Sequence, residues 1–262
     1  MNTLASDFQR MPGHWVLASL GKRVLRPGGL GLTRIMLEQL HIGHNDDVVE
    51  FAPGLGVTAS MTLQRQPRSY VAIEQDERAA ATARSYVSGD RRQVIIADAQ
   101  DVPLESHTAT VIYGEAMLTM QSPVQKEQII REAARLLKPG GKYGIHEMSL
   151  ADPTIDPQRR KEVRQDLARA IRVNVAPLTS AEWIDLLENH GFHVLAVQTA
   201  PMHLLHLKRL LEDEGISGVL KISGNLLRNR QARQRVLEMR RQFIKHAAQL
   251  QAISIVAEYK PR

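Results

Sequence analysis

The chain has 262 residues, 43% of them hydrophobic, a formal net charge of +6 and no cysteine. This length and apolar content suffice to bury a full core and favour one α/β domain with insertions. The absence of cysteine excludes disulfides and thiol chemistry, and no apolar run approaches the roughly 18 residues of a membrane span.

Residues 1–40 are expected to form a helical segment ahead of the main domain, which we place at 41–262. Their start lacks the basic and apolar blocks of a secretory signal, so we expect a cytoplasmic protein. Apolar spacing predicts a helix near Trp15 to Leu20, a break at Arg26-Pro27-Gly28-Gly29, and a second helix over 32–40. The buried face of the second helix should hold Ile35, Met36 and Leu40. His14 and Trp15 are expected to pack in the core, with substrate contact as the alternative.

A short apolar strand at Val48-Val49 runs into Glu50 and then into the small-residue turn Ala52-Pro53-Gly54-Leu55-Gly56. A helix should follow, so unpaired N–H groups at its start would face a ligand that small residues allow to approach closely. The turn also matches the G-x-G-x-x-G/A fingerprint of dinucleotide-binding proteins, which leaves a nicotinamide-dependent oxidoreductase as an alternative. Glu50 disfavours that alternative, because its carboxylate would repel a pyrophosphate but could pair with an ammonium group.

Two further strands are predicted to end in acids. Residues 69–74 form one strand and end at Glu74, which could accept hydrogen bonds from both hydroxyls of a ribose. Residues 93–97 form the next strand and lead to Asp98 and Ala99. The acids therefore fall where a nucleoside-binding sheet would place its ligand.

A fourth strand over 109–113 and a fifth over 142–147 flank an amphipathic helix at 124–137. Ligands in open parallel sheets lie beyond the carboxyl ends of the strands, so residues at these two ends are candidates for catalysis. The candidates are Tyr113, Glu115 and His146. We expect His146 to act as general base if the reaction needs one, because a histidine titrates near neutral pH.

The order acid, small residue, Gly-x-Gly, followed by Glu74, Asp98 and Arg-Leu-Leu-Lys-Pro-Gly-Gly-Lys at 135–142, resembles class I S-adenosylmethionine-dependent methyltransferases. The resemblance covers about 100 residues in register. It departs from the family pattern at Ala52, where a glycine is usual. It implies a doubly wound, mostly parallel, seven-stranded α/β sheet whose last strand is antiparallel.

The resemblance also implies where S-adenosylmethionine would bind. Glu50 and the turn would hold the methionine part, Glu74 the ribose, and Asp98 with its neighbouring backbone the adenine. The expected cofactor-binding residues are Glu50, Ala52, Pro53, Gly54, Gly56, Glu74, Gln75, Asp98, Ala99 and Gly114. Such a cofactor carries an activated methyl group, so a general base is needed only if the acceptor must lose a proton.

The C-terminal part should add helices to this sheet. We expect a lid insertion at 151–178, a helix opened by a capping box of Thr179 and Glu182, strands at 192–197 and 252–259, and a helical insertion at 201–250. The insertion should contain two helices, over 201–214 and 225–250, separated by glycines, with Leu204, Leu205, Leu207, Leu210 and Leu211 covering the acceptor site. No metal site is expected, since His203 and His206 form an isolated pair.

A basic segment at 221–245 contains eight lysines or arginines and one acid, Glu238. Our main hypothesis is methyl transfer to a small, partly hydrophobic acceptor of the quinone or lipid type. The alternative is a protein that binds RNA or an anionic surface through the basic segment, with methylation of that partner or an inactive cofactor site. Nucleic acid is not the favoured partner, and a homodimer is a further expectation.

Overall fold

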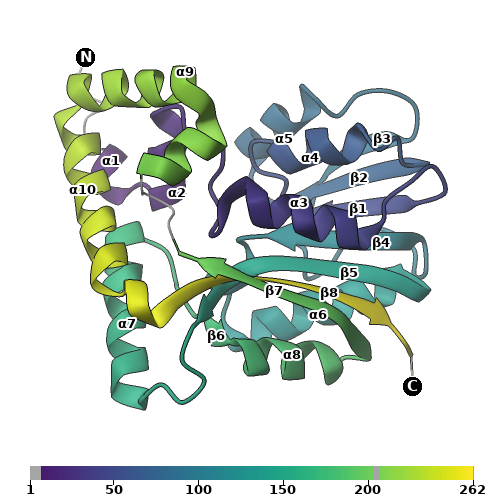
Figure 1. The fold of residues 1–262 in the computed structure, drawn as a ribbon. Helices are drawn as coiled ribbons and strands as arrows, with labels where there is room; N and C mark the ends of the chain where they lie inside the picture. Colours follow the sequence, from purple (N-terminus) through teal and green to yellow (C-terminus); the bar gives the residue numbers. More distant parts are fainter. Residues whose placement is uncertain (1–6, 203–206, 262) are drawn as a thin grey trace.

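The computed structural model describes residues 7–202 and 207–261, and one twisted sheet lies at its centre (Figure 1). In this described part the sheet has eight strands, and seven of them lie in the order β3-β2-β1-β4-β5-β8-β7. The strands are β1 (Asp47–Phe51), β2 (Ser69–Glu74), β3 (Arg92–Ile96), β4 (Ala109–Glu115), β5 (Leu137–Leu150), β6 (Leu178–Thr179), β7 (Phe192–Pro201) and β8 (Leu250–Tyr259).

The pairing confirms the predicted topology. Strand β8 runs antiparallel to both β5 and β7, and the other pairs are parallel. The two-residue strand β6, which pairs with β5, was not predicted. Because β1 lies between β2 and β4, the order of the sheet reverses there, and a crevice opens beyond the carboxyl ends of these strands.

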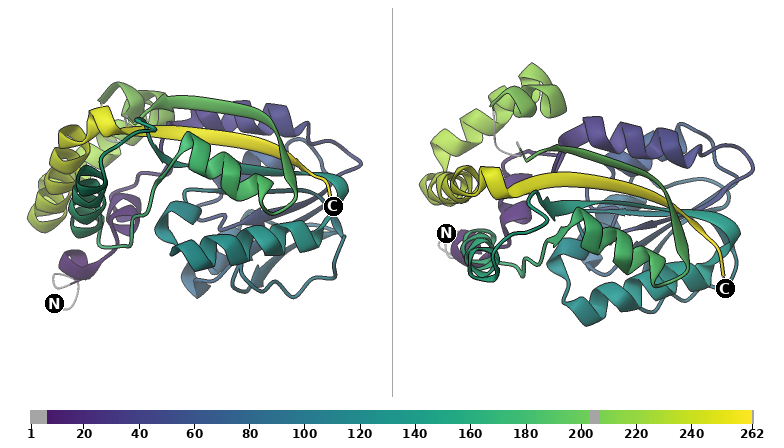
Figure 2. Two further views of the ribbon diagram at one scale, coloured as in Figure 1. Left: turned by 90° about the horizontal axis from the view of Figure 1, so that it is seen from below. Right: turned by 60° about the horizontal axis from the view of Figure 1, so that its bottom comes forward.

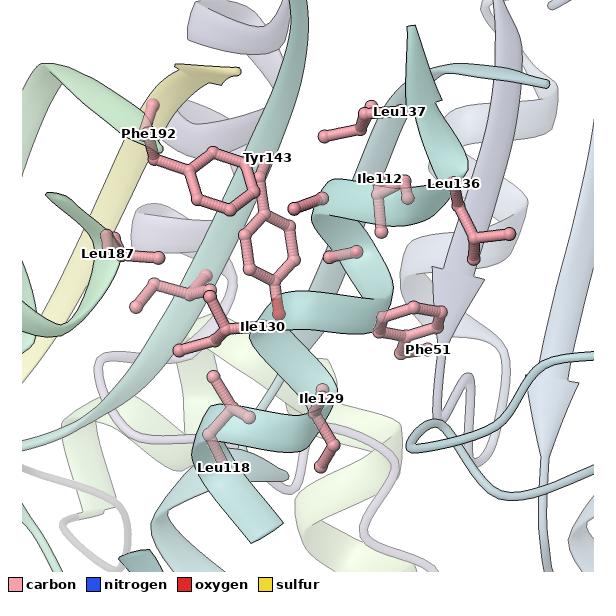
Figure 3. Packing of buried hydrophobic residues seen from close by; sticks show 14 of the residues in the cluster. Phe51, Ile112, Leu118, Ile129, Ile130, Leu136, Leu137, Tyr143, Leu187 and Phe192 are labelled. Atoms are coloured by element: carbon pink, nitrogen blue, oxygen red, sulfur yellow. The ribbon is translucent and has the colours of Figure 1, made fainter. Parts of the chain in front are cut away.

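Helices cover both faces of the sheet (Figure 2). Helices α3 (Gly29–Leu40) and α4 (Val57–Leu63) pack on one face, and α6 (Pro123–Leu136) and α8 (Ser180–Glu188) pack on the other. Helix α5 (Glu77–Arg84) packs against β2 and β3 at the sheet edge. The core under α6 and α8 includes Phe51, Ile112, Ile130, Tyr143 and Phe192 (Figure 3). Burial of the parallel sheet on both faces explains why Val48, Val49 and Phe51 of β1 are all apolar and buried, although they point to opposite faces.

The ends of α6 and α8 follow from their capping residues. Ser122 accepts a hydrogen bond from the Gln125 backbone N–H, and the Gln125 side chain bonds the Ser122 backbone in return. Thr179 and Glu182 form the same reciprocal pair at the start of α8, as the sequence predicted. These two helices therefore begin at fixed residues, and the start of α6 lies beside the cavity at Gln125.

A second group of helices lies at the end of the sheet where β5 ends and β8 begins (Figure 1). It contains α1 (Asp7–Arg10), α2 (Gly13–Ser19), α7 (Pro157–Ile171), α9 (Leu207–Arg228) and α10 (Arg230–Lys245). Helix α10 contacts the other four. We call this set the helical group; it has its own apolar core, which includes Val16, Leu167, Ala232, Met239 and Phe243.

Long-range polar contacts tie the C-terminal insertion to the N-terminal segment. Glu214 of α9 accepts hydrogen bonds from the backbone N–H groups of Arg23 and Val24, both at 2.8 Å. Arg235 of α10 is buried and donates to the carbonyl of Ala170 at 2.7 Å and to that of Met11 at 3.3 Å. Residues far apart in the sequence thus form one packed unit.

Some sequence expectations were wrong in detail. Ile35 is 38% exposed rather than buried, because the inner face of α3 carries Leu32, Met36, Leu37 and Leu40. The first helix of the insertion breaks at Gly215, whose φ is 70°, as expected, but α9 then continues through Gly218 and Gly224 to Arg228. The second helix, α10, begins at Arg230 rather than at 225. His203, Leu204, Leu205 and His206 lie outside the described residues, and the side chain of Leu207 is not described either. In the described ranges, no helix is both long and apolar enough to cross a membrane.

Candidate active site

A cavity of about 550 Å³ lies between the carboxyl ends of β1, β2 and β4 and the helical group. One end is lined by the glycine turn and by acidic residues of the sheet, and the other end by apolar side chains of α2, α7 and α10. The sequence-predicted cofactor residues on its wall are Glu50, Ala52, Pro53, Gly54, Gly56, Glu74, Gln75, Asp98 and Ala99. The acid-rich and apolar ends share one space, so two ligands of different polarity could meet there.

Glu50 is the last residue but one of β1 and is 3% exposed. The hydroxyl groups of Tyr70 and Tyr113 both donate to its Oε2, the latter at 2.7 Å. Burial raises the pKa of Glu50 to about 7, and the two tyrosine hydrogen bonds only partly offset that rise. A buried carboxylate is costly unless it is paired, so a cation such as an ammonium group in the cavity would stabilise the ionised form of Glu50.

The turn after Glu50 has left-handed backbone at three positions. Ala52, Gly54 and Gly56 have φ values of 53°, 53° and 75°. Ala52 therefore adopts the conformation for which glycine is usual, at a cost of roughly 1–2 kcal/mol for its Cβ. The departure of Ala52 from the family pattern changes the side chain but keeps the shape of the turn.

Tyr86 fixes the second half of this turn and was missed by sequence reasoning. Its hydroxyl donates to the Gly54 carbonyl at 3.1 Å, and a Cβ added to Gly56 would lie 1.7 Å from its Cζ atom. Gly56 is thus required by the packing of a tyrosine ring as well as by its φ value. An aromatic residue near the end of a helix gives no sequence signal for this role.

Glu74 and Asp98 lie on the cavity wall at the ends of neighbouring strands. Glu74 is 7% exposed, accepts from the Asp76 N–H at 3.1 Å and the Gly54 N–H at 3.4 Å, and has its pKa raised by burial. Asp98 is exposed, and both its oxygens accept from Gln100 at 2.9 Å. The buried acid suits a pair of hydroxyl groups, and the exposed one suits a donor at the rim.

A buried polar cluster at the wall of the cavity joins the segment before α3 to α3, α4, β4 and β5. Arg26 pairs with Glu115 and also contacts Thr58, while Thr33 donates to Glu115 at 2.6 Å. Arg26 chiefly lowers the pKa of Glu115, to about 2, against the effect of burial. Glu115 therefore lines the cavity as a paired carboxylate, and Arg26, which the sequence presented only as part of a break, contributes its partner charge.

His146 belongs to this cluster and does not line the cavity. Its Nδ1 lies 2.7 Å from Glu115 Oε1, its Nε2 faces the Pro27 carbonyl, and the side chain is fully buried. Both ring nitrogens are thus occupied by acceptor oxygens of the chain. The expectation of a general base at His146 has no support in this geometry, which gives the residue a role in joining β5 to the segment before α3.

Tyr113 and Gly114 also lie away from the cavity. The Tyr113 hydroxyl bonds Glu50 and Thr62, so this residue supports the acid rather than facing a substrate. Gly114 packs against Met117, and a Cβ added to Gly114 would lie 2.9 Å from the Met117 sulfur. Successive side chains of β4 point to opposite faces of the sheet, and the sequence does not show which of them face the cavity.

Glu147, next to His146, holds the loop after β4. This fully buried carboxylate accepts from the backbone N–H groups of Met117, Leu118 and Thr119 at 2.9, 2.7 and 3.0 Å, and from the Thr119 hydroxyl at 2.7 Å. Four donors satisfy it, so it fixes the wall of the cavity at Met117 and Thr119.

The apolar end of the cavity is formed by the helical group. Its lining includes Leu17, Ile171, Val175, Met202, Met239 and Phe243. His14 and Trp15 of α2 also line it, with ring centroids 5.2 Å apart. Burial lowers the pKa of His14, with a smaller opposing effect of Asp76. Among the described residues, His14 rather than His146 is the histidine on the cavity wall.

Sequence comparison with known proteins points to a methyltransferase. A family model described as "Methyltransferase domain" matches residues 48–141. An uncharacterized protein of Haemophilus influenzae is 32% identical over 221 residues, which are 82% of this chain and 86% of that protein. A mitochondrial 2-methoxy-6-polyprenyl-1,4-benzoquinol methylase of Caenorhabditis elegans is 23% identical over 190 residues, 69% of this chain and 61% of the relative.

A solved structure shares the fold. The Phospholethanolamine N-methyltransferase 2 of Haemonchus contortus, in complex with phosphomonomethylethanolamine and S-adenosylhomocysteine, superposes with a TM-score of 0.70 at 15% identity. The match covers 96% of this chain and 58% of that one. The fold of that protein therefore includes almost all of the elements described above.

Proposed function

Because this chain belongs to the class I S-adenosylmethionine-dependent methyltransferases and is an enzyme of that class, we propose that it methylates a small, partly hydrophobic acceptor. One observation carries the proposal: the cavity joins an acid-lined end beside the glycine turn to an apolar end built by the helical group. The first end suits the cofactor S-adenosylmethionine, and the second suits the acceptor.

We assign the cofactor contacts from the geometry of the wall. Glu50 would pair with the ammonium group of the methionine part, since it is buried and lacks a cationic partner among its hydrogen bonds. Glu74 would accept from the ribose hydroxyls, and Asp98 from the adenine amino group. Ala52, Gly54 and Gly56 would let the backbone approach the ligand closely, as small residues in left-handed conformations do.

When bound, the cofactor supplies a methyl group that its sulfonium already activates. The chain then has to orient the acceptor and exclude water, and such positioning contributes roughly 7–11 kcal/mol in favourable cases. Met239 and Phe243 of α10 would hold the apolar part of the acceptor, and Trp15 would close the cavity from α2. His14 would take a proton if the acceptor must lose one, because burial keeps its imidazole neutral over more of the pH range.

The apolar lining supports a partly hydrophobic acceptor over a small polar one. In agreement with this, one relative is named for a quinol with a polyprenyl chain. The test of the acceptor is methyl transfer from labelled S-adenosylmethionine to alkyl-substituted benzoquinols and, in parallel, to glycine and ethanolamine. We expect label in the apolar acceptors; transfer only to the polar amines would overturn this part of the proposal.

The cofactor assignment is tested by calorimetric titration with S-adenosylhomocysteine and, separately, with NAD. We expect the first ligand to bind and the second not to bind. Glu74→Ala should weaken binding of S-adenosylhomocysteine at least about tenfold, as loss of a buried charged acceptor typically costs more than 1.4 kcal/mol. Glu77→Ala, a change at an exposed acid of α5, is the matched control and should bind like the wild type. Equal affinity of the two variants would show that the ribose contact lies elsewhere.

A further inference from the structure

Helix α9 carries aliphatic side chains on the face that points away from the protein. Ile216, Leu220 and Leu227 are 73%, 68% and 75% exposed. They are spaced by four and seven residues, so they lie within about 40° of one another around the helix axis. The opposite face holds Ile222, which is 5% exposed, and Asn225, which donates to the Leu20 carbonyl at 3.0 Å. Ile216, Leu220 and Leu227, which we call the stripe, are therefore exposed because the opposite face of α9 is the one that packs on the protein.

Basic side chains flank this stripe. Lys221 and Arg228 of α9 are exposed, and Arg230 follows at the start of α10. Among the described residues, the ion pairs do not include any of these three. No acid occurs between Gly215 and Glu238. The stripe is therefore bordered by unneutralised positive charge.

The outer face of α10 also combines basic and exposed aliphatic side chains. Arg230, Arg233, Leu237, Arg240, Arg241 and Ile244 recur at spacings of three and four residues and lie on one face of that helix. Leu237 and Ile244 are 55% and 51% exposed. The inner face carries Arg235, Met239 and Phe243, so the basic segment divides into a structural side and an outward side.

We propose that the outer faces of α9 and α10 dock on an anionic lipid membrane surface. Aliphatic side chains beside lysines and arginines are the mark of a helix that lies in the membrane interface, where the apolar groups enter the acyl boundary and the charges meet lipid phosphates. Continuity with the cavity supports this occupant, because α10 lines the acceptor end with Met239 and Phe243. A membrane-held acceptor would then reach the cavity along α10; this last step rests on the proposed function, whereas the docking itself does not.

The surface fits lipid better than nucleic acid or a second copy of the chain. Single-stranded nucleic acid is bound by basic residues with aromatic side chains, and 216–245 has one aromatic residue, Phe243, which is 7% exposed and lines the cavity. Two copies joined through this face would bring at least four arginines of each α10 together without acids to pair them. An anionic bilayer satisfies both the charges and the aliphatic stripe.

The test is co-sedimentation of the full chain with vesicles of phosphatidylglycerol in phosphatidylcholine, and with vesicles of phosphatidylcholine alone. We expect binding to the anionic vesicles that falls as salt is added. The stripe variant Ile216→Ser/Leu220→Ser/Leu227→Ser should bind at least about tenfold more weakly, since withdrawing one leucine from an apolar environment alone costs about that factor. The charge variant Lys221→Gln/Arg228→Gln/Arg230→Gln should lose about fivefold per charge.

Matched controls use exposed residues of other elements. Val124→Ser/Leu195→Ser removes aliphatic side chains that are 65% and 49% exposed on α6 and β7, and Arg78→Gln/Arg84→Gln removes exposed charges from α5. These should bind vesicles like the wild type. Titration of each variant with S-adenosylhomocysteine tests, without vesicles, whether the variant is folded with an intact cofactor site. A loss of vesicle binding alone is therefore distinguished from a failure of the proposed function.

Three results would overturn the proposal. The first is no difference between the two kinds of vesicle for the wild type. The second is RNA binding that the charge variant loses and the stripe variant keeps, without vesicle binding. The third is a dimer that the stripe variant converts to monomer, again without vesicle binding, which would make a second copy the occupant.

Discussion

At the scale of a single residue, the burial of Glu50, the proposed partner of the cofactor ammonium group, also affects stability. Burial raises its pKa from 4.5 to about 7. Between these pH values the folded protein holds a proton that the unfolded chain has released, so this residue makes stability fall as pH rises through the window. The contribution lost by pH 8 is about 3 kcal/mol, at 1.36 kcal/mol for each unit of pKa.

We therefore expect Glu50→Gln to be more stable than the wild type at pH 8 and closer to it at pH 5, as measured by urea unfolding. Glutamine keeps the size and an acceptor for Tyr70 and Tyr113 but does not ionise. Binding of S-adenosylhomocysteine should show the opposite trend in the wild type, tightening from pH 5.5 to about 7, because its ammonium favours the ionised carboxylate. A Glu50→Gln variant with the pH dependence of the wild type would refute this assignment.

Gly56 and Tyr86 are a second pair of residues that depend on each other, because the tyrosine ring occupies the space where a Cβ at position 56 would lie. Gly56→Ala should lower the free energy of unfolding by more than about 2 kcal/mol, through overpacking and a strained φ. Replacing Tyr86 by Ala in the same chain should recover part of this loss in a double-mutant cycle. Gly43→Ala, at a position with no atom within 4 Å of the added Cβ, is the control and should change stability little.

The sequence predicted the acids of the site better than it predicted their supports. Glu50, Glu74 and Asp98 lie at strand ends or within two residues of them, and strand ends are visible in a pattern of apolar residues followed by an acid. Tyr86, Arg26 and Glu147 act through contacts with distant segments, which leave no local signal. His146 shows the same limit: the sequence predicted its position on β5 but not its partners, Pro27 and Glu115.

At the scale of an element, helix α10 carries arginines in two different environments. Arg235 is 3% exposed and joins α10 to α7 and to the segment before α2. Arg241, on the outer face, is exposed. Their difference depends on which face of α10 meets α2 and α7, and the basic sequence at 221–245 predicted the helix without indicating that face.

Arg235→Ala should therefore destabilise the protein by about 2–3 kcal/mol, because it leaves buried carbonyls without a donor and opens a cavity between α10 and α7. Arg241→Ala should stay within about 0.5 kcal/mol of the wild type. Thermal and urea unfolding of both variants provide the measurement. Equal losses in the two variants would show that Arg235 is not a structural contact.

At the scale of the molecule, the cavity exists because the sheet and the helical group each have a core and meet at the carboxyl ends of the strands. The sheet was predictable, since each strand combines local apolar patterning with a recognisable family order. The helical group was predicted only as separate helices, because its packing pairs α2 with α7 and α10 over long stretches of sequence. The apolar end of the cavity lies in this less predictable half.

Met239→Trp should fill the acceptor end of the cavity while leaving the acidic end unchanged. We expect unchanged binding of S-adenosylhomocysteine and a raised KM for whichever apolar acceptor the screen identifies. Leu237→Trp, on the outer face of the same helix, should alter neither quantity in solution assays without membranes. If Met239→Trp weakened S-adenosylhomocysteine binding and left the acceptor KM unchanged, the two ends would have to be exchanged.

The contacts of Arg235 with Met11 and of Glu214 with Arg23 span 224 and 191 residues of sequence. A ribosome adds roughly 5–20 residues per second, so α2 would emerge about 10–40 s before the helix that covers it. During that interval its apolar face, with Val16, Leu17 and Leu20, would have no native cover from α10. The nascent chain should thus be a client of a chaperone that shields short hydrophobic segments until synthesis is nearly complete.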